Sequence, residues 1–222
     1  MTDQLTLAEE NYLKAIFHLE KLSTKGVSTN DIAKALKTKA SSVTDMIKKL
    51  SEKNYVNYKK YQGTKLTKKG TKIAVNIVRK HRLWEVFLVE NLNFSWDEVH
   101  EVAEQLEHIK SEKLIDELDT FLNHPSHDPH GDPIPDKEGN FNKIDKISLA
   151  KANINKTYSC VGVKDTYTAF LHYLDHHNIA LGTTIKVIYK EPFDNSIKIN
   201  LDGNDLFVSN NVAKNLFLKE LK

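Results

Sequence analysis

Four side chains that can bind metal ions recur in one stretch of the chain at helical spacing. His100, Glu104, Glu107 and His108 stand at positions i, i+4, i+7 and i+8, and on a helix they fall within an arc of roughly 100°. They lie beside the apolar positions of that helix, where carboxylates and imidazoles are costly to bury unless a cation meets them. The spacing therefore predicts a shared metal-binding face.

Further candidate ligands flank this stretch. His81 and Glu85 form an i, i+4 pair on the preceding helical pattern, and a downstream loop carries His124, His127, Asp128, His130 and Asp132. Oxygen and imidazole ligands without a thiolate suit Mn²⁺, Fe²⁺, Co²⁺ or Zn²⁺. Each histidine alone has an ordinary explanation as a surface or capping residue. Six of the ten histidines lie between positions 81 and 130 in an acid-rich segment, which favours metal binding by the group.

Charge is distributed unevenly along the chain. Residues 1–72 carry 15 lysines and 7 acidic residues, whereas residues 73–142 carry 6 basic and 15 acidic residues. Residues 143–222 carry 11 lysines and 8 acidic residues, so the net charge of +2 hides two oppositely charged segments. The first segment suits a polyanion and the second suits cations, although solvated surfaces with these charges are an alternative explanation.

The lysine-rich segment has the sequence pattern of a winged helix-turn-helix. Helices are predicted at about 7–22, opened by a capping box at Thr6-Leu7-Ala8-Glu9, at about 28–36 and at about 40–51. Two short strands at 55–58 and 65–66 surround Gln62-Gly63 as a small hairpin. In such a motif the third helix enters the major groove of DNA and the hairpin contacts the backbone.

The residues that could contact DNA follow from this arrangement. Hydroxyl groups on the first half of the third helix can reach base edges, and lysines on the helix and hairpin can neutralise phosphates. Helix capping and ordinary surface solvation explain the same residue types without DNA. The candidates are Ser41, Ser42, Thr44, Lys48, Lys59, Lys60 and Lys65.

Beyond residue 71 the pattern predicts helices first and strands later. A long helix from Thr71, a helix opened by a second capping box at Ser95 and reaching Ile109, and a third around 114–122 are followed by a Pro- and Gly-containing loop at 124–142. Strands at 158–163, 184–189, 197–201 and 206–208 and a helix at 165–177 predict a small α+β or barrel-like domain. The expected fold class is mainly α with a small β-rich C-terminal domain.

Composition excludes several classes of protein. The 222 residues contain no apolar run of 18 or more, so no membrane-spanning helix is expected. Acidic residues near the N-terminus do not match a signal peptide. The single Cys160 cannot form an internal disulfide. We therefore expect a cytoplasmic protein.

The chain resembles the diphtheria-toxin-repressor family of metal-dependent transcriptional repressors, in its manganese-responsive branch. The resemblance is carried by ASSVTDMIKKL with its wing, HRLWEVFLVENL, VHEVAEQLEHIKS and PHGDPIP, over about residues 6–135. It implies a winged helix-turn-helix DNA-binding domain at 1–72, a helical dimerisation and metal-binding domain at 73–142, and an SH3-like (FeoA-like) domain at 143–222. The resemblance implies a homodimer that is not an enzyme. Such a homodimer binds operators of metal-uptake genes with Mn²⁺, or Fe²⁺, as corepressor.

The resemblance also assigns metal ligands. One site maps to Glu104, Glu107 and His108, with a ligand from the first helix at Asn11, where manganese-type members tend to carry Asp. Glu104 stands where iron-type members have Cys, which favours a hard cation such as Mn²⁺. A second site maps to His81, Glu85, His100, Asp128, His130 and Asp165, the last from the third domain.

Two other classes of function use the same residues. A metal-dependent hydrolase would keep an open metal position for water, but the chain has no HExxH-type signature and this class leaves the basic N-terminal segment without a role. A structural or metal-storage protein would bind metal without any effect on DNA affinity.

Overall fold

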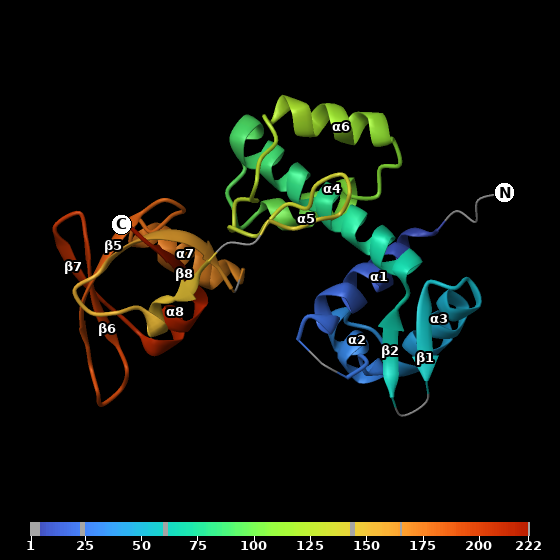
Figure 1. Ribbon diagram of the computed structural model, residues 1–222, viewed down its shortest axis with the longest axis horizontal. Coiled ribbons are helices and arrows are strands. Elements are labelled where there is room, and N and C mark those ends of the chain that lie inside the picture. The colour runs from blue at the N-terminus through green and yellow to red at the C-terminus, as the bar shows by residue number, and fades with distance from the viewer. Residues whose placement is uncertain (1–4, 23–24, 60–61, 143–144, 165, 222) are drawn as a thin grey trace. The chain divides into compact units, whose positions relative to one another are not determined.

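A computed structural model describes residues 5–22, 25–59, 62–142, 145–164 and 166–221 (Figure 1). The chain divides into two compact units, which are described separately. The first comprises Met1–Arg82, Glu104–Asp116 and Pro135–Phe141, and the second comprises Leu83–Ala103, Glu117–Ile134 and Asn142–Lys222. Among the described residues, no helix combines the length and apolar character that crossing a bilayer requires.

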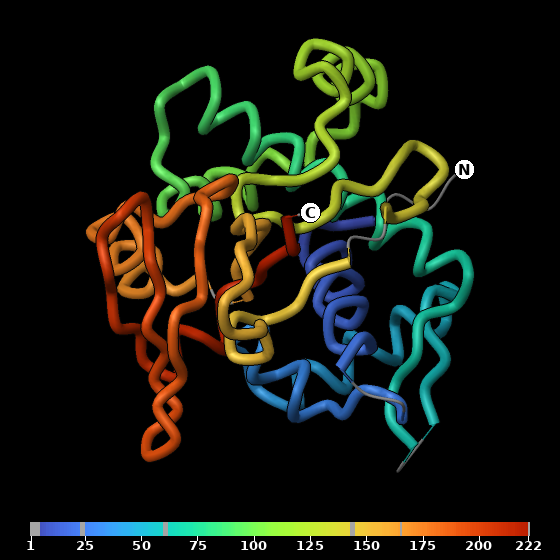
Figure 2. Tube along the Cα trace, turned by 60° about the vertical axis from the view of Figure 1, so that its left-hand side comes forward, coloured from blue at the N-terminus to red at the C-terminus, as the bar shows by residue number. Residues whose placement is uncertain are grey.

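The first unit begins with three helices and a hairpin. Helices α1 (Leu7–Glu20), α2 (Thr29–Ala35) and α3 (Ala40–Glu52) precede strands β1 (Val56–Lys59) and β2 (Gly63–Leu66), which pair antiparallel. Thr6 and Glu9 form the predicted capping box of α1, and Ser28 caps α2. The hairpin lies beside α3 (Figures 1 and 2). The predicted winged helix-turn-helix is therefore confirmed.

Apolar side chains spaced at helical period hold this module together. Leu13, Ile16, Ile32, Val43 and Ile47 are fully buried in one hydrophobic cluster. The turn between α2 and α3 contains no glycine. Instead Lys37 adopts the left-handed conformation, at φ 49°.

Three further helices carry the candidate metal ligands. The predicted long helix is α4 (Lys68–Leu92), followed by α5 (Val99–Leu106) and α6 (Glu112–Phe121). The expectation that Ser95 opens the helix of α5 and that it reaches Ile109 is wrong, because residues 96–98 form a turn and the helix ends at Leu106. Glu98 does accept a hydrogen bond from the Ser95 N–H, as half of a capping box. Glu107 and His108 consequently lie in the turn after α5.

The C-terminal part of the second unit is built on one antiparallel sheet. Its strands are β3 (Ile147–Ser148), β4 (Thr157–Val163), β5 (Thr184–Lys190), β6 (Ile197–Leu201), β7 (Asn204–Val208) and β8 (Leu216–Glu220), in the order β3-β8-β4-β5-β6-β7. A short 3₁₀ helix (Leu149–Lys151), α7 (Thr168–His176) and α8 (Asn210–Asn215) accompany the sheet. The mainly helical chain with a β-rich C-terminal domain is as expected.

Two predictions for this domain need correction. Helix α7 begins at Thr168 and not at 165, where Asp165 lies outside the described residues. The sequence pattern also gave no warning of α8 and β8. Strand β8 pairs with both β3 and β4, and its Leu216 and Leu218 are fully buried. Within the described chain, β8 therefore completes the core of the domain.

Candidate metal centre

A cluster of charged side chains from α1, α4 and α5 lies in the first unit. The Nζ atom of Lys14 is 2.5 Å from Oε1 of Glu104 and 2.6 Å from Oε2 of Glu107. His81 places its Nδ1 atom 2.6 Å from the same Glu107 oxygen. Glu107 is fully buried and Lys14 and His81 are nearly so. Ionised groups are buried together only when their opposite charges compensate one another. This cluster is therefore a specific buried site of paired charges.

His108 is oriented by a carboxylate of α1. Its Nδ1 atom lies 2.6 Å from Oε2 of Glu10, and its Nε2 atom lies 3.9 Å from Oε1 of Glu107. A histidine whose Nδ1–H donates to a carboxylate presents the lone pair of Nε2, which is the usual arrangement of a metal-binding histidine. Glu10 therefore prepares His108 to bind a cation on the Glu107 side.

Two buried oxygen atoms, one on α1 and one in the turn after α5, have no hydrogen-bond partner among the described residues. They are Oδ1 of Asn11 and Oε1 of Glu107, the latter on the side of Glu107 that faces His108. A buried acceptor without a partner costs free energy of about 1–3 kcal/mol, which a bound cation would recover. The residues thus fit a hard divalent ion held by Asn11, Glu104, Glu107 and His108.

Helix α1 connects this cluster to α3, the helix expected to read DNA. Glu9 is fully buried, and its Oε1 atom pairs with Lys53 at 2.9 Å and Lys49 at 3.2 Å. Burial disfavours the charged form of Glu9, but the Thr6 N–H and the two lysines outweigh it and lower the pKa to about 2. Lys49, near the C-terminal end of α3, is therefore engaged within the protein.

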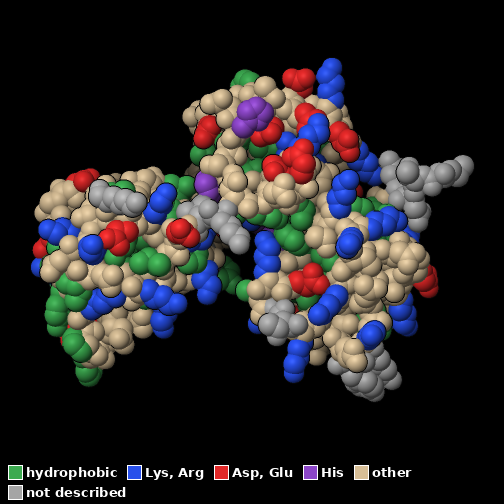
Figure 3. Space-filling model, viewed as in Figure 1, with side chains coloured by type: hydrophobic (Ala, Val, Ile, Leu, Met, Phe, Trp, Pro, Cys, Tyr) green, Lys and Arg blue, Asp and Glu red, His purple; other side chains and the backbone are tan. Residues whose placement is uncertain are grey.

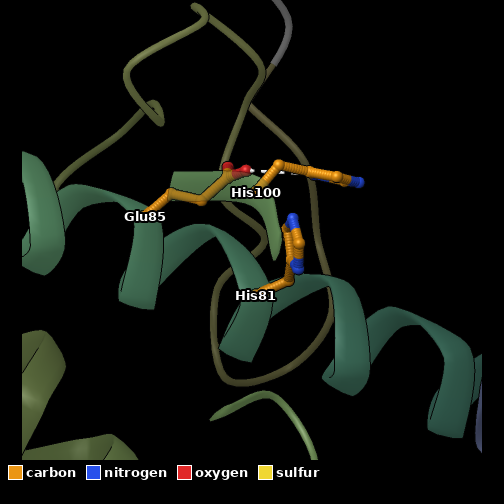
Figure 4. A group of neighbouring side chains, drawn as sticks. All are labelled: His81, Glu85 and His100. Atoms are coloured by element: carbon orange, nitrogen blue, oxygen red, sulfur yellow. Dashed lines mark ion pairs between the residues drawn. The ribbon is translucent and has the colours of Figure 1, made fainter. Parts of the chain in front are cut away.

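A second group of candidate ligands surrounds Glu85 in the second unit. His100 Nδ1 lies 3.5 Å from one Glu85 oxygen, and His130 Nδ1 lies 3.8 Å from the other. Figure 4 shows Glu85 and His100 facing each other, with His81 one helical turn before Glu85 on α4. Asp128 places Oδ1 4.0 Å from Nδ1 of His130. Glu85, Asp128 and His130 are all buried.

The backbone fixes the orientation of His130. Its Nε2 atom lies 2.7 Å from the carbonyl oxygen of Trp96, so Nε2–H donates and Nδ1 faces the carboxylates. Burial disfavours the charged imidazolium, but the hydrogen bond and charge of Glu85, followed by Asp128, outweigh burial and raise the pKa to about 9. The carboxylates around His130 therefore attract positive charge at neutral pH.

The structure divides the predicted ligands differently from their spacing. One helical face was expected to hold His100, Glu104, Glu107 and His108 together. His100 instead faces Glu85, whereas the other three join residues of α1. Because α5 ends at Leu106, Glu107 and His108 lie in the following turn and not on the helical face that was expected. Asp165 cannot be placed, because it lies outside the described residues.

Sequence reasoning missed two residues of the first cluster. Lys14 and Glu10 stand four residues apart on α1, so they share a face with one another. Both are buried next to Leu13, which is fully buried. A charged pair on the apolar face of a short helix was the available signal, because lysine and glutamate are rarely buried unless they are paired.

Most of the expected DNA-contacting residues that the structure describes are exposed on the N-terminal module. Figure 3 shows lysines spread over this module and acidic side chains gathered over the α4–α6 helices. The Thr44 hydroxyl donates to the carbonyl of Ala40, so it is engaged within α3. Lys60 lies outside the described residues. Exposed side chains are those of Ser41, Ser42, Lys48, Lys59 and Lys65.

Three protein-family models match the chain. The N-terminal DNA-binding domain of iron-dependent repressors matches residues 4–64, and the metal-binding and dimerisation domain of the same repressors matches residues 67–136. The FeoA domain matches residues 147–220.

Individual relatives agree with these models. The chain is 39% identical over 113 residues to an uncharacterized HTH-type transcriptional regulator of Methanocaldococcus jannaschii, covering 51% of this chain and 90% of the relative. It is 36% identical over 120 residues to the regulator MntR of Oceanobacillus iheyensis, covering 54% and 80%. It is 32% identical to the iron-dependent repressor IdeR of Mycobacterium tuberculosis, covering 60% of this chain and 57% of IdeR.

Solved structures extend the similarity to the third domain. A manganese-dependent transcriptional repressor in complex with manganese matches with a TM-score of 0.84 at 31% identity, over 96% of this chain and all of that chain. The manganese regulator SloR matches with a TM-score of 0.74 at 34% identity, over 96% and 98%. Structures of the relative ScaR contain Zn²⁺ or Cd²⁺.

A winged helix-turn-helix joined to a buried carboxylate–histidine cluster defines a class of protein, the metal-dependent transcriptional regulators. The chain belongs to the iron-dependent, or diphtheria-toxin, repressor family, in its manganese-responsive branch. The family consists of DNA-binding repressors, and the comparisons give no support to the hydrolase alternative.

Proposed function

We propose that the protein represses metal-uptake genes by binding their operators when Mn²⁺, or Fe²⁺ as the second candidate, is bound at the first cluster. The observation that carries this proposal is the unpartnered pair of buried oxygens on Asn11 and Glu107 beside an oriented His108. Asn11, Glu104, Glu107 and His108 would hold the ion. Three oxygen ligands and one imidazole suit Mn²⁺, and no thiolate favours a softer metal.

We further propose a second metal site around Glu85. His81, Glu85, His100, Asp128 and His130 are the candidate ligands, with Asp165 as a candidate from the C-terminal domain. Support comes from the buried Glu85, Asp128 and His130, whose ligand atoms lie within 4.8 Å of one another. The Trp96 carbonyl, which fixes Nε2 of His130, leaves Nδ1 for the ion.

Each domain of the chain would have its own role in repression. Residues 1–72 would read DNA through Ser41, Ser42, Thr44, Lys48, Lys59, Lys60 and Lys65, residues 73–142 would bind metal and dimerise, and residues 143–222 would form the SH3-like domain. Helix α6 supports dimerisation because it exposes Leu114 and Phe121, which are seven residues apart and share a face. Because a repressor acts on the chromosome, we infer a cytoplasmic location.

The mechanism follows from the role of α1 in the first cluster. A bound divalent ion supplies positive charge that the carboxylates share. Asn11 and Glu10 lie on α1, whereas Glu107 and His108 follow α5, so these residues tie α1 to the metal-binding segment. Glu9, next to Glu10, holds Lys49 and Lys53 of the α3 segment. Residues that fix α1 therefore also fix the helix that would enter the major groove, and coupling of about 1–3 kcal/mol would tighten DNA binding about 5–150-fold.

The test uses duplexes selected from a random-sequence pool by the full-length protein loaded with Mn²⁺. We expect Mn²⁺ to strengthen binding of the selected duplex by about 5–150-fold, and Glu107→Gln to abolish most of this gain. Glu117→Gln, an exposed position on α6, is the matched control and should respond like the wild type. Selection of no duplex, or equal binding with chelator and with Mn²⁺, would refute the proposal.

A further inference from the structure

The side chain of Lys14 lies among three candidate metal ligands. His81, Glu104 and Glu107 offer ligand atoms that all lie within 4.8 Å of one another. The Nζ atom of Lys14 contacts each of these residues, at 3.2 Å from Nδ1 of His81, 2.5 Å from Glu104 and 2.6 Å from Glu107. The cation position among these three ligands is thus already filled by an ammonium group of the chain itself.

We propose that Lys14 is a resident cation of the first metal centre, which excludes a divalent ion from the His81 side and limits the centre to one ion on the His108 side. The inference rests on the proposed function, because it takes Glu104 and Glu107 as metal ligands. It assigns a specificity-determining role to a residue that is itself no ligand.

The two carboxylate oxygens of Glu107 face the two sides of the first metal centre, one toward His81 and one toward His108. Oε2 faces Lys14 and His81, at 2.6 Å from both. Oε1 has no hydrogen-bond partner and lies 3.9 Å from Nε2 of His108. An ammonium and a divalent ion would compete for the same lone pairs on Oε2 and repel each other. Oε1 is the side of the carboxylate left for the ion.

Asn11 stands on the same face of α1 as Lys14, three residues before it. Its unpartnered Oδ1 atom is neutral. The negative charge of Glu104 and Glu107 is therefore balanced in part by Lys14, and Asn11 adds none. This charge balance keeps the two carboxylates together in the metal-free protein. It also weakens attraction for the incoming ion, so Lys14 sets the concentration at which the centre responds.

The experiment counts Mn²⁺ ions bound per chain by equilibrium dialysis of the full-length protein, with Mn²⁺ alone as the probe. Lys14→Met removes the charge and keeps much of the volume. We expect this variant to bind one more ion per chain than the wild type, and its tightest site to bind at least about tenfold more strongly. An ion held by Glu85, Asp128 and His130 contributes equally to both proteins.

Thermal unfolding of the metal-free proteins supplies a readout that does not depend on DNA binding. Lys14→Met should unfold at a lower temperature without metal, because Glu104 and Glu107 then repel each other, and Mn²⁺ should restore most of the loss. Lys14→Arg keeps a cation and should rescue the wild-type ion count. Lys34→Met, at an exposed position on α2, controls for the loss of a surface lysine.

The outcomes separate failure of this inference from failure of the proposed site. If Glu107→Gln lowers Mn²⁺ binding but Lys14→Met changes neither ion count nor affinity, the role of Lys14 is wrong and the site stands. If Glu107→Gln leaves Mn²⁺ binding unchanged, the site itself is wrong. Should Lys14→Met not fold without metal, refolding with Mn²⁺ must recover it, and a lack of recovery counts against the inference.

Discussion

Single residues set the charge of the first metal centre. Glu104 and Glu107 bring two negative charges, Lys14 returns one positive charge, and the proposed ligand Asn11 would add a neutral oxygen. An amide oxygen binds a hard divalent cation more weakly than a carboxylate does, because it lacks the charge that attracts the ion. The position of Asn11 is therefore where one substitution should change metal affinity most directly.

Asn11→Asp should raise Mn²⁺ affinity by roughly tenfold, equivalent to about 1.4 kcal/mol, because a carboxylate replaces a neutral ligand. The same charge placed near Glu107 should lower the melting temperature of the metal-free protein. Both effects can be measured on one sample by Mn²⁺ titration and thermal unfolding. Asn11→Leu keeps the approximate size without an oxygen and should weaken Mn²⁺ binding; unchanged affinity in both variants would remove Asn11 from the ligand set.

At the scale of elements, α1 would connect the proposed metal site to the helix proposed to read DNA. Glu10 on α1 contacts His108 of the candidate metal centre, whereas Glu9 contacts Lys53 at the C-terminal end of α3. Three consecutive residues of a helix point in different directions, so one helix can reach both neighbours at once. A shift of α1 would therefore change its contacts with both neighbours.

Glu9→Gln should break this connection with little effect on the metal ligands. It removes the charge that pairs with Lys49 and Lys53, and we expect a loss of about 2 kcal/mol in the free energy of unfolding at pH 7. The pKa of Glu9 is lowered to about 2 in the folded protein. Its contribution is therefore present above about pH 4.5 and lost as pH falls toward 2. Urea unfolding from pH 7 to pH 3 measures both.

The result that bears on function is Mn²⁺-dependent DNA binding by Glu9→Gln. Mn²⁺ affinity should stay close to that of the wild type, while the gain in DNA binding on adding Mn²⁺ should shrink severalfold. Glu20→Gln would not serve as a control, because Glu20 accepts a hydrogen bond from the Leu66 N–H of the wing. Glu52→Gln at the end of α3 is better placed. Full Mn²⁺ stimulation in Glu9→Gln would exclude this route.

Much of the element pattern could be predicted because local rules decide it. The capping groups of α1 and α2 and the period of Val43, Ile47 and Leu50 specify helices without any tertiary information. Strand β8 escaped prediction because the run at 216–220 pairs with β3 and β4, which are distant in sequence. Such pairing is decided by tertiary context and not by propensity.

The sequence could nominate candidate metal ligands but not their arrangement in the fold. Residue types and spacing identified Glu104, Glu107 and His108, yet spacing assumed a helix that continues past Leu106. The end of a helix is the least certain part of such a prediction. Lys14 was missed because a lysine in a lysine-rich segment is ordinarily expected at the surface, and its position four residues after Glu10 on the apolar face of α1 was overlooked.

At the scale of the molecule, the loop that carries Asp128 and His130 is packed against the C-terminal sheet. The Val163 N–H of β4 donates to the carbonyl of His130 at 2.9 Å. Gly131 adopts φ +83°, and a Cβ atom there would lie 2.1 Å from the Val161 oxygen. Only glycine allows the loop and β4 to approach this closely. The sheet domain thus supports the second proposed metal site through backbone contact.

Gly131→Ala should therefore destabilise the second unit by about 3 kcal/mol or more, since both the backbone conformation and the close approach are lost. Gly182→Ala is the matched control, because Gly182 has a similar φ of +87° but no atom within 4 Å of the added Cβ. It should cost only the conformational term of about 1–2 kcal/mol. Urea unfolding followed by tryptophan fluorescence compares the two variants.

A measurement of metal binding tests whether the packing of the Gly131 loop against β4 is needed for the proposed site around Glu85. Gly131→Ala should lose the ion bound near Glu85, because Asp128 and His130 shift with the loop, and should keep the ion bound near Glu107. Counting Mn²⁺ per chain in Gly131→Ala and in Gly182→Ala separates these effects, since the control disturbs backbone conformation without displacing the loop. Equal destabilisation and equal ion counts in the two variants would show that contact between the loop and β4 does not support metal binding.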